Sequence, residues 1–334
     1  MKISGSIYSD KQRPLQKVIQ DLVGHQIDLL HVDCNNSLEV FKDIENIRTW
    51  CNTPIDLHII TNDPEKFFPY LKKHPVEYIT FQYEDLTGPL NIPSEIKGKK
   101  GLALTTPTNV DVFTEFEYMD FILIMATTPG QSGGVFNQHN FSKIRQFRKR
   151  YPRKSIHVDG GVNAEVSFIL RNMGVSSSVS GSYLFSEASI GNALMNLTQR
   201  EIHSHYCIKD FMTPLAEAPA ITLEGASTKT MLQCVEDGKM GFALILGEKT
   251  ELIGLVSSAD IRKALLKKID TPSPITMKDL INHQPISIQG KATVNDLLKK
   301  IKSCPFPIMY LPVIDDYGNA IGIVNFTHLI KGEI

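Results

Sequence analysis

The first 200 or so residues repeat one unit, in which a short apolar run is followed by a polar break and then by a segment with helical spacing. Between most of the runs, as in Leu38–Cys51, Pro64–His74 and Phe141–Tyr151, apolar residues recur every three or four positions. Strands that alternate with helices pair in parallel, because a parallel connection needs a crossover of about a dozen residues. The apolar runs are Lys2–Tyr8, Ile27–Asp33, Pro54–Ile60, Glu77–Gln82, Lys100–Thr105, Asp120–Ala126, Ser155–Asp159 and Val175–Ser180.

The number of these units predicts the architecture. Eight strand–helix units in about 200 residues are typical of a closed (β/α)8 TIM barrel, at the short end of its usual size. A doubly wound open α/β sheet is the alternative, because periodicity alone does not show that a sheet closes.

The pattern changes in the second part of the chain. Apolar content falls around Asn196–Tyr206, and from Ile208 onward the chain reads as two similar halves of about 60 residues. Each half predicts the order strand–helix–strand–strand–helix, an α+β unit too small to bury much apolar surface alone, so we expect the halves to pack as a pair. The expected limits are 1–200 for the barrel, 201–207 for a linker, and 208–270 and 271–334 for the two halves.

Composition excludes several classes of protein. Among 334 residues, 35 Lys and Arg balance 36 Asp and Glu, so the net charge of −1 gives no broad attraction to nucleic acid or anionic lipid. No apolar run reaches the ~18 residues of a membrane span, and the first residues lack the apolar core of a secretory signal. The five cysteines are odd in number, widely spaced and never in a CxxC pair. We therefore expect a cytoplasmic protein in a reducing compartment, with neither a nucleic-acid nor a membrane partner.

Histidines and aspartates stand at the predicted strand ends, where TIM barrels carry their chemistry. His31 and Asp33 are two apart on one strand, so their side chains project to the same side. His58 ends the next strand and Asp159 ends the seventh. Two imidazoles and two carboxylates predict a His2Asp2 site for a divalent first-row metal. The alternative is a relic site of ordinary polar residues.

Glycine-rich loops follow the last three strands. They read PGQSGG at Pro129–Gly134, DGGVN at Asp159–Asn163 and SGS at Ser180–Ser182. Glycines allow backbone N–H groups to approach an anion, and the last loops of such barrels commonly bind phosphate. Although tight turns also require glycine, three such loops beside the metal residues predict a phosphorylated substrate.

These motifs together resemble the ribulose-phosphate 3-epimerase family. The resemblance covers essentially the first 200 residues, in matching order and strand position. It is specific, because the two-His, two-Asp set and the PG-x-x-GG and VDGG loops occur together in few other barrels. The segments that carry it are GSIYS at Ser6, HVD at His31–Asp33, DLHI at Asp56–Ile59, IMATTPGQSGG at Ile124–Gly134, HVDGGV at His157–Val162 and SGSYLF at Ser180–Phe185.

The resemblance implies epimerisation at C3 of a ketose 5-phosphate. One aspartate removes the C3 proton and the other returns a proton to the opposite face, and Asp33 and Asp159 occupy the matching positions. A divalent Zn, Fe, Mn or Co ion held by His31, Asp33, His58 and Asp159 stabilises the charge that develops on the ene-diolate oxygens. The residues implied to hold the substrate are Ser6, His58, Gly130, Gln131, Ser132, Gly133, Gly160, Gly161, Gly181 and Ser182.

The sequence also departs from the family. Cys34–Ser37 stands where active epimerases carry a longer substrate-covering loop, and Ile60, Gln82 and Val135 replace an expected methionine, histidine and glutamine. The residues that match the family's metal ligands and proton carriers are kept, whereas the segment that would cover the substrate is changed. Three hypotheses follow: ordinary ribulose 5-phosphate epimerisation, action on another phosphosugar by a related epimerase or isomerase of surface-glycan synthesis, or a non-catalytic sugar-phosphate or nucleotide sensor.

The C-terminal halves resemble a tandem CBS pair, also called a Bateman module. Gly254–Leu265 reads GLVSSADIRKAL, in which Ser257 and Asp260 stand at the start of a predicted helix. The resemblance implies that these two residues contact the ribose or phosphate of AMP, ADP or ATP. In the second half Asn325 and His328 replace them, which leaves one plausible nucleotide site. The alternative is that the pair only dimerises the chain, and a homo-oligomer is expected in either case.

Overall fold

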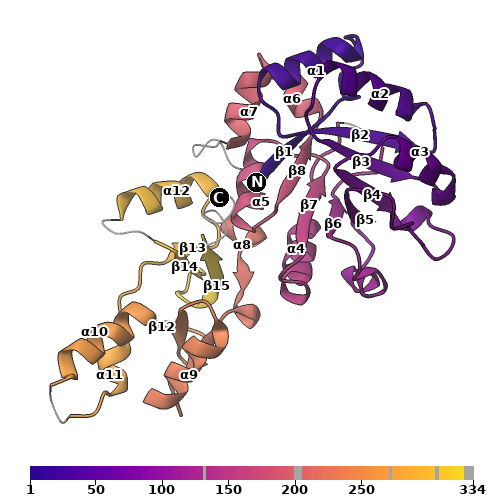
Figure 1. Cartoon of the computed structure of the whole chain (residues 1–334). Coiled ribbons are helices and arrows are strands. Elements are labelled where there is room, and N and C mark those ends of the chain that lie inside the picture. Colours follow the sequence, from indigo (N-terminus) through magenta and orange to yellow (C-terminus); the bar gives the residue numbers. More distant parts are fainter. Residues whose placement is uncertain (131–132, 199–204, 271–272, 305–307, 327–334) are drawn as a thin grey trace. The chain divides into compact units, whose positions relative to one another are not determined.

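The computed structural model describes residues 1–130, 133–198, 205–270, 273–304 and 308–326. The described residues divide into two compact units, one within 1–198 and the other within 205–326 (Figure 1). Each unit is considered by itself below. Among the described helices, none combines the length and the apolar character needed to cross a membrane.

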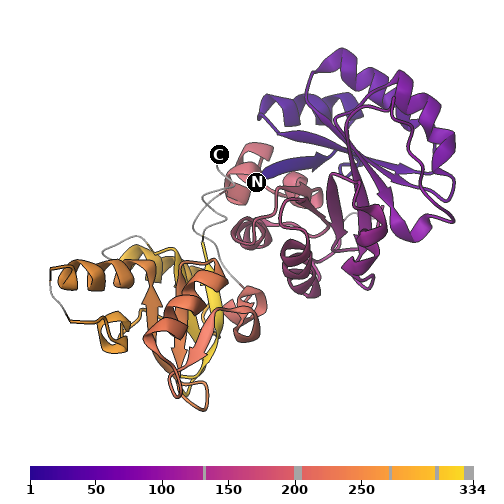
Figure 2. The ribbon, with the colours of Figure 1, turned by 60° about the horizontal axis from the view of Figure 1, so that its bottom comes forward.

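The first unit is a closed barrel of eight parallel strands, in which each strand pairs with the next and β8 pairs with β1. Each strand overlaps one of the eight apolar runs, so the predicted TIM barrel is confirmed and the open sheet is excluded. Figure 2 shows the ring of strands with helices around it. The strands are β1 Lys2–Ser6, β2 Leu29–Asn35, β3 Ile55–Ile60, β4 Tyr78–Gln82, β5 Lys99–Thr105, β6 Phe121–Met125, β7 Ser155–Asp159 and β8 Ser177–Ser180.

Most connections of the barrel are amphipathic helices. The α-helices are α1 Leu15–Gly24, α2 Val40–Trp50, α3 Phe68–Lys73, α4 His139–Arg150, α5 Ala164–Asn172, α6 Ser182–Ser186 and α7 Ile190–Thr198. Short 3-10 helices also occur at η1 Pro64–Phe67, η2 Tyr83–Asp85 and η3 Val110–Phe116. The connections that follow β4 and β5 carry only η2 and η3. After η2, Gly88, Pro89 and Pro93 explain the missing α-helix, because glycine and proline disfavour helix interiors.

The interior of the barrel is packed, so a site can form only near the carboxyl ends of the strands. A Cβ on Gly101 would lie 2.3 Å from Cε2 of Phe121, so this glycine makes room for that ring inside the barrel. The Phe121 ring stacks on His157 with centroids 4.2 Å apart. Ala103, Leu123 and Met125 form a further buried cluster on neighbouring strands.

The second unit contains two small sheets, ordered β10-β11-β12 and β13-β14-β15-β9. The predicted element order is found in both halves, although the closing helix of the second half falls at residues outside the described part. Strand β9 lies near the start of the first half in sequence yet pairs with β15 of the second, so the halves are interlocked. The elements are α8 Ile208–Phe211, β9 Thr213–Pro214, η4 Leu215–Glu217, β10 Ala220–Thr222, α9 Thr228–Gly238, β11 Phe242–Leu246, β12 Leu252–Ser257, α10 Ser258–Lys268, α11 Met277–Leu280, β13 Ile288–Gln289, α12 Val294–Ser303, β14 Tyr310–Ile314 and β15 Ala320–Asn325.

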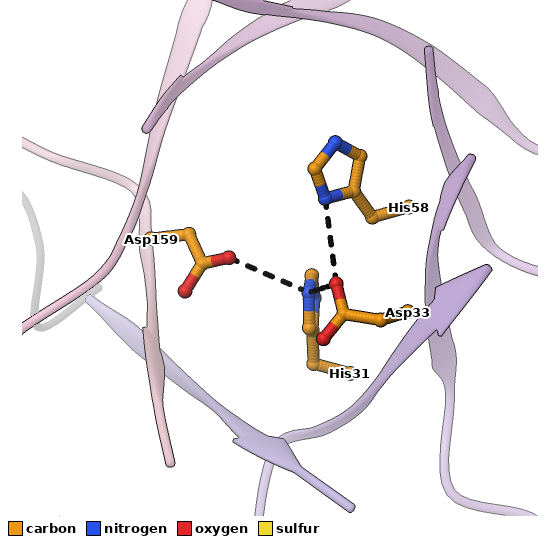
Figure 3. A group of neighbouring side chains, drawn as sticks. All are labelled: His31, Asp33, His58 and Asp159. Atoms are coloured by element: carbon orange, nitrogen blue, oxygen red, sulfur yellow. Dashed lines mark ion pairs between the residues drawn. The ribbon is translucent and has the colours of Figure 1, made fainter. Parts of the chain in front are cut away.

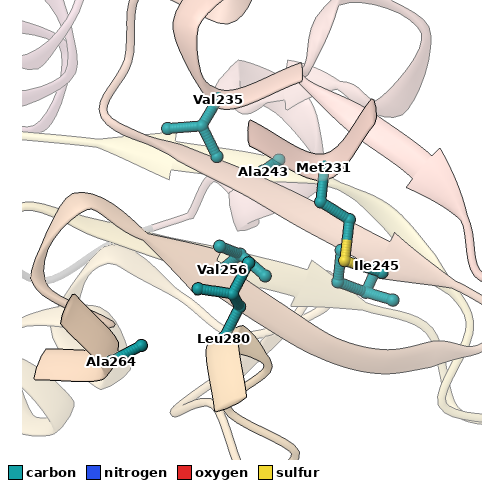
Figure 4. Packing of buried hydrophobic residues seen from close by; sticks show 7 residues of the cluster. All are labelled: Met231, Val235, Ala243, Ile245, Val256, Ala264 and Leu280. Atoms are coloured by element: carbon teal, nitrogen blue, oxygen red, sulfur yellow. The ribbon is translucent and has the colours of Figure 1, made fainter. Parts of the chain in front are cut away.

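Strand β11 connects the two cores of this unit because all five of its residues are buried. Its alternate side chains face opposite ways. Ala243 and Ile245 pack with Met231 of α9 and with other residues of the cluster in Figure 4. Phe242, Leu244 and Leu246 pack instead in a cluster that contains Ala320 and Ile323 of β15. The two halves therefore share apolar surface, as their small size requires.

Candidate metal and substrate site

Three strands bring the four predicted metal ligands together at the carboxyl ends of the barrel strands. His31 and Asp33 are two residues apart on β2. In the register of β2 and β3 they lie opposite Asp56 and His58, respectively. Asp159 is the last residue of β7. One ligand atom of each of His31, Asp33, His58 and Asp159 lies within 4.8 Å of all the others (Figure 3).

The ligand atoms face one another at distances too long for good hydrogen bonds. His31 Nε2 lies 3.3 Å from Asp33 Oδ1 and 3.6 Å from Asp159 Oδ2, and His58 Nδ1 lies 3.5 Å from Asp33 Oδ1. His31 Nε2, Asp33 Oδ1 and His58 Nδ1 are buried and have no hydrogen-bond partner. Buried polar atoms without partners are costly, and a divalent cation among them would satisfy all three at once. The donor set therefore fits the predicted first-row metal.

A second layer of side chains holds the two imidazoles from behind. His31 Nδ1 lies 2.9 Å from Oδ2 of Asp56, and His58 Nε2 lies 2.9 Å from Oε1 of Gln82. A carboxylate only accepts hydrogen bonds, so Asp56 places the hydrogen on Nδ1 of His31 and leaves Nε2 toward the centre. Asp56 was not among the residues predicted to form the site. The sequence signal that could have indicated Asp56 is its position two residues before His58, on the same face of β3.

The electrostatics of the centre favour a positive charge between the two carboxylates. Burial opposes the charged form of His31, but Asp33 and Asp56 outweigh it and raise the pKa of His31 well above its usual value. Burial also opposes ionisation of Asp33, yet His31 and His58 keep the pKa of Asp33 far below its usual value. For Asp159 burial prevails and raises the pKa to about 6, since Asp33 adds to the effect and His31 only partly offsets it. The two aspartates thus differ in proton affinity.

Several residues predicted to bind substrate lie around this centre. Ser6 ends β1 opposite His31 in the strand register and accepts a hydrogen bond from Ser9 Oγ at 2.9 Å. Gly160 and Gly161 follow β7 with φ of 108° and 67°, a region that favours glycine. The remaining predicted residues are Gly130 and Gly133 in the loop after β6, Gly181 and Ser182 after β8, and Gln131 and Ser132, which lie outside the described residues.

A pocket of about 730 Å³ lies at the same end of the barrel, between the loops that follow β5 and β6. Its lining carries hydroxyl groups from both loops, which suits a ligand with several hydroxyl groups. The threonines among the lining residues are Thr105, Thr106, Thr127 and Thr128.

Ser257 and Asp260, the predicted nucleotide-binding residues, hydrogen-bond each other at the start of α10. Ser257 Oγ donates to Asp260 Oδ2 at 2.6 Å, and the Asp260 N–H donates to Ser257 Oγ at 3.2 Å. This capping box gives both residues a structural role that is independent of any ligand. Asn325, their counterpart in the second half, ends β15, whereas His328 lies outside the described residues.

Comparison with known families identifies the barrel. The model of the ribulose-phosphate 3-epimerase family matches residues 2–185. This chain belongs to the ribulose-phosphate 3-epimerase family. A CBS domain model matches residues 277–333, within the second predicted half. The predicted combination of an epimerase-family barrel with a CBS domain in the second half is therefore confirmed.

Individual relatives agree with this assignment at modest identity. The ribulose-phosphate 3-epimerase of Candida glabrata is 29% identical over 161 residues, which is 47% of this chain and 65% of that enzyme. The enzyme of the same name from Bacillus subtilis is 24% identical over 212 residues, 59% of this chain and 98% of that enzyme. The Methanocaldococcus jannaschii enzyme is 28% identical over 230 residues, 64% of this chain and 95% of its own length.

Solved structures similar to this chain include CBS proteins. CBSX2 in complex with AMP is 23% identical, with a TM-score of 0.32 over 38% of this chain and 96% of that chain. CBSX2 from Arabidopsis thaliana is 24% identical, with a TM-score of 0.32 over 38% of this chain and 94% of that chain.

Proposed function

We propose that this protein is a metal-dependent epimerase of a ketose 5-phosphate, of the ribulose 5-phosphate/xylulose 5-phosphate type. The observation that carries the proposal is the convergence of two imidazoles and two carboxylates at the carboxyl ends of β2, β3 and β7 in a barrel of this family. His31, Asp33, His58 and Asp159 would hold a divalent Zn, Fe, Mn or Co ion. Such an ion supplies Lewis-acid stabilisation of the negative charge that develops on the substrate oxygens.

The two aspartates would perform the proton transfers. Asp33 and Asp159 come from different strands, β2 and β7, so they can approach the substrate carbon from different sides. One removes the C3 proton and the other delivers a proton to the opposite face, which inverts that carbon. Ser6 and the glycine loops after β6, β7 and β8 would hold the hydroxyl groups and the phosphate.

The C-terminal pair would serve regulation by AMP, ADP or ATP, or dimerisation of the chain. The domain limits proposed for the whole chain are 1–200, 201–207, 208–270 and 271–334. A cytoplasmic location and a homo-oligomeric state are further parts of this proposal.

A non-catalytic sugar-phosphate sensor is the second candidate, and the segment after β2 favours it. Asn36 adopts a left-handed φ of 56°, its side chain accepts a hydrogen bond from Thr61 Oγ1 at 2.7 Å, and α2 begins at Val40. This short anchored turn replaces the longer substrate-covering loop expected from the family. A related epimerase or isomerase that acts on another phosphosugar stays a third possibility for the same reason.

Proton NMR in D2O distinguishes these functions. The metal-loaded protein is incubated with ribulose 5-phosphate, and loss of the C3 proton signal and formation of xylulose 5-phosphate are followed. We expect exchange with conversion. Exchange without conversion would point to another phosphosugar, and no exchange in a protein shown to hold metal would favour either another substrate or the sensor.

The variant Asp159→Asn tests the role of the aspartate. It should lower the exchange rate by about 100-fold or more, because a positioned acid–base group contributes that much. Asp120→Asn is the matched control. Asp120 directly precedes β6, at the end of the barrel opposite to the site, and accepts a hydrogen bond from the N–H of Lys100 at 2.8 Å. An undiminished rate in Asp159→Asn would contradict the assignment.

A further inference from the structure

The imidazole of His58 is the first member of a chain of polar contacts that leads away from the metal centre. His58 Nε2 lies 2.9 Å from Gln82 Oε1, and both side chains are buried. The Gln82 amide nitrogen donates to Glu84 Oε2 and, at 3.4 Å, to the carbonyl oxygen of Ala103. Glu84 thus contacts the neighbour of a metal ligand without touching the centre.

The partners of the Gln82 amide determine which way round it lies. An amide end that faces a carboxylate or a carbonyl oxygen must be its NH2 end, because both partners only accept hydrogen bonds. Glu84 Oε2 and Ala103 O are two such acceptors. The carbonyl end of Gln82 therefore faces His58.

This orientation in turn determines the tautomer of His58. Gln82 Oε1 accepts hydrogen bonds, so His58 must carry its hydrogen on Nε2. Nδ1 is then left with a lone pair. That atom is buried, has no hydrogen-bond partner and lies 3.5 Å from Asp33 Oδ1, on the side of the metal centre.

The Glu84 carboxylate is itself held by the last residue of β5 and by the loop that follows it. Its Oε1 accepts hydrogen bonds from the Thr105 N–H at 2.8 Å, from Thr105 Oγ1 at 2.7 Å and from Thr108 Oγ1. Burial opposes ionisation of Glu84, but the bonds from Thr108 and Thr105 prevail and lower its pKa. Although Glu84 is exposed as a residue, both of its carboxylate oxygens are occupied and it acts as an acceptor only.

We infer that Glu84 is a positioning residue that acts through Gln82 to fix the Nε2–H tautomer of His58 and present its Nδ1 lone pair to the metal. The inference rests on the metal centre of the proposed function but does not depend on which sugar is turned over. Groups that orient a ligand histidine typically change metal affinity by 10- to 100-fold.

The decisive variant is Glu84→Gln, which keeps the size of the side chain. The Thr105 N–H only donates, so the new amide must turn its oxygen toward Thr105 and its NH2 toward Gln82. Gln82 then turns its own oxygen to that NH2 and its NH2 to His58, which gives up the 3.4 Å bond to the carbonyl oxygen of Ala103 and moves the histidine hydrogen to Nδ1. We expect the Nδ1–H tautomer and at least about 10-fold weaker metal binding.

The exchanged pair Gln82→Glu/Glu84→Gln restores the original pattern. The carboxylate at position 82 accepts from His58 Nε2 and from the amide at position 84, whose oxygen still accepts from Thr105. Both the Nε2–H tautomer and the metal affinity should return. Glu77→Gln is the matched control, because Glu77 is also exposed and accepts a backbone N–H, that of Ile55 at 2.7 Å, but precedes β4 at its other end.

The first experiment is long-range ¹⁵N–¹H NMR of protein labelled with ¹⁵N-histidine and free of metal. The signals of His58 are assigned by their absence from the spectrum of His58→Gln. The second experiment is calorimetric titration of each protein with Zn²⁺. The result expected is Nε2–H in the wild type and in Glu77→Gln, Nδ1–H with weaker binding in Glu84→Gln, and recovery in the exchanged pair. An unchanged tautomer in Glu84→Gln, or an exchanged pair that folds without recovery, would overturn the inference. Tight Zn²⁺ binding and the expected tautomers without epimerisation would support the inference while contradicting the proposed reaction.

Discussion

Asp56 Oδ2 lies 2.9 Å from His31 Nδ1, and both side chains are buried inside the barrel. Ser4 Oγ donates to the same oxygen at 3.2 Å, whereas Asp56 Oδ1 has no hydrogen-bond partner. Burial opposes ionisation of Asp56, but the attraction of His31 prevails and keeps the pKa of this carboxyl below its usual value. A buried carboxylate behind a ligand histidine fixes the ring and makes it a stronger donor to a metal.

The first prediction concerns this pair. Asp56→Asn removes the negative charge behind His31 while keeping the size of the side chain, so Zn²⁺ binding should weaken by about 10- to 100-fold. Calorimetric titration measures the change. Asp120→Asn, which alters a carboxylate remote from the centre, should bind Zn²⁺ as the wild type does. Equal affinities for all three proteins would show that Asp56 does not support the metal site.

The convergence of the four residues of the candidate metal centre could be predicted from the sequence, whereas Asp56 and Glu84, which lie behind two of them, were not predicted. A side-chain period of two on a strand placed His31 and Asp33 on one side without further information. The pairing of Asp56 with His31 depends on the stagger between β2 and β3, which the period does not determine. Glu84 lies beyond the end of β4 in a 3-10 helix, where no strand periodicity indicates the direction of a side chain.

The fold, like the site, could be predicted from the sequence only in part. Eight apolar runs predicted eight strands because buried parallel strands are continuously apolar. The pairing of β9 with β15 was not foreseen, since a strand of two residues, Thr213–Pro214, has no period to recognise. Proline in such a short edge strand is compatible with pairing on only one side.

The second prediction concerns the two loops that glycine brings together. A Cβ on Gly161 would lie 2.2 Å from the backbone nitrogen of Phe136, whereas a Cβ on Gly133 would meet no atom of the described residues within 4 Å. Both glycines have positive φ, of 67° and 89°. Gly133→Ala should therefore destabilise the barrel by about 1 kcal/mol through backbone strain alone. Gly161→Ala should cost more, about 2 kcal/mol or above, because backbone atoms must also move.

Urea unfolding followed by tryptophan fluorescence measures this difference, because the only tryptophan of the chain, Trp50, lies on α2 of the barrel. Equal losses of stability in Gly161→Ala and Gly133→Ala would contradict the close approach of the two loops.

The third prediction separates the structural role of Ser257 from its proposed nucleotide role. Ser257 caps α10 with Asp260, and Thr293 caps α12 with Asp296 in the same way. Ser257→Ala and Thr293→Ala should each lower the stability of the second unit by about 1 kcal/mol, through loss of a cap. If Ser257 also binds nucleotide, only Ser257→Ala should lose the rise in melting temperature caused by AMP, ADP or ATP.

Differential scanning calorimetry with and without each nucleotide provides both measurements. The same nucleotide-dependent shift in both variants would limit Ser257 to its capping role. No shift in the wild type with any of the three nucleotides would favour a pair that only dimerises the chain.

The last prediction is a pH dependence of stability that originates at Lys143. This lysine on α4 is mostly buried and donates to the carbonyl oxygen of Thr105. Burial lowers its pKa from 10.5 to about 8, although the charge of Glu84 opposes the shift. Below pH 8 the folded and unfolded chains are both protonated at this site, so the cost of burying the charge is fully present.

Between pH 8 and 10.5 the unfolded chain keeps a proton that the folded chain releases, so stability rises with pH. The full shift corresponds to at most about 3 kcal/mol, and partial hydration of the amine reduces our expectation to about 1–2 kcal/mol.

The measurement is the free energy of unfolding of the wild type minus that of Lys143→Met, by Trp50 fluorescence in urea at several pH values. This difference should increase from pH 8 to 10.5, whereas the corresponding difference for Lys149→Met, an exposed lysine of the same helix, should stay constant. A flat difference for Lys143→Met would mean that the Lys143 amine is solvated as an ordinary lysine is.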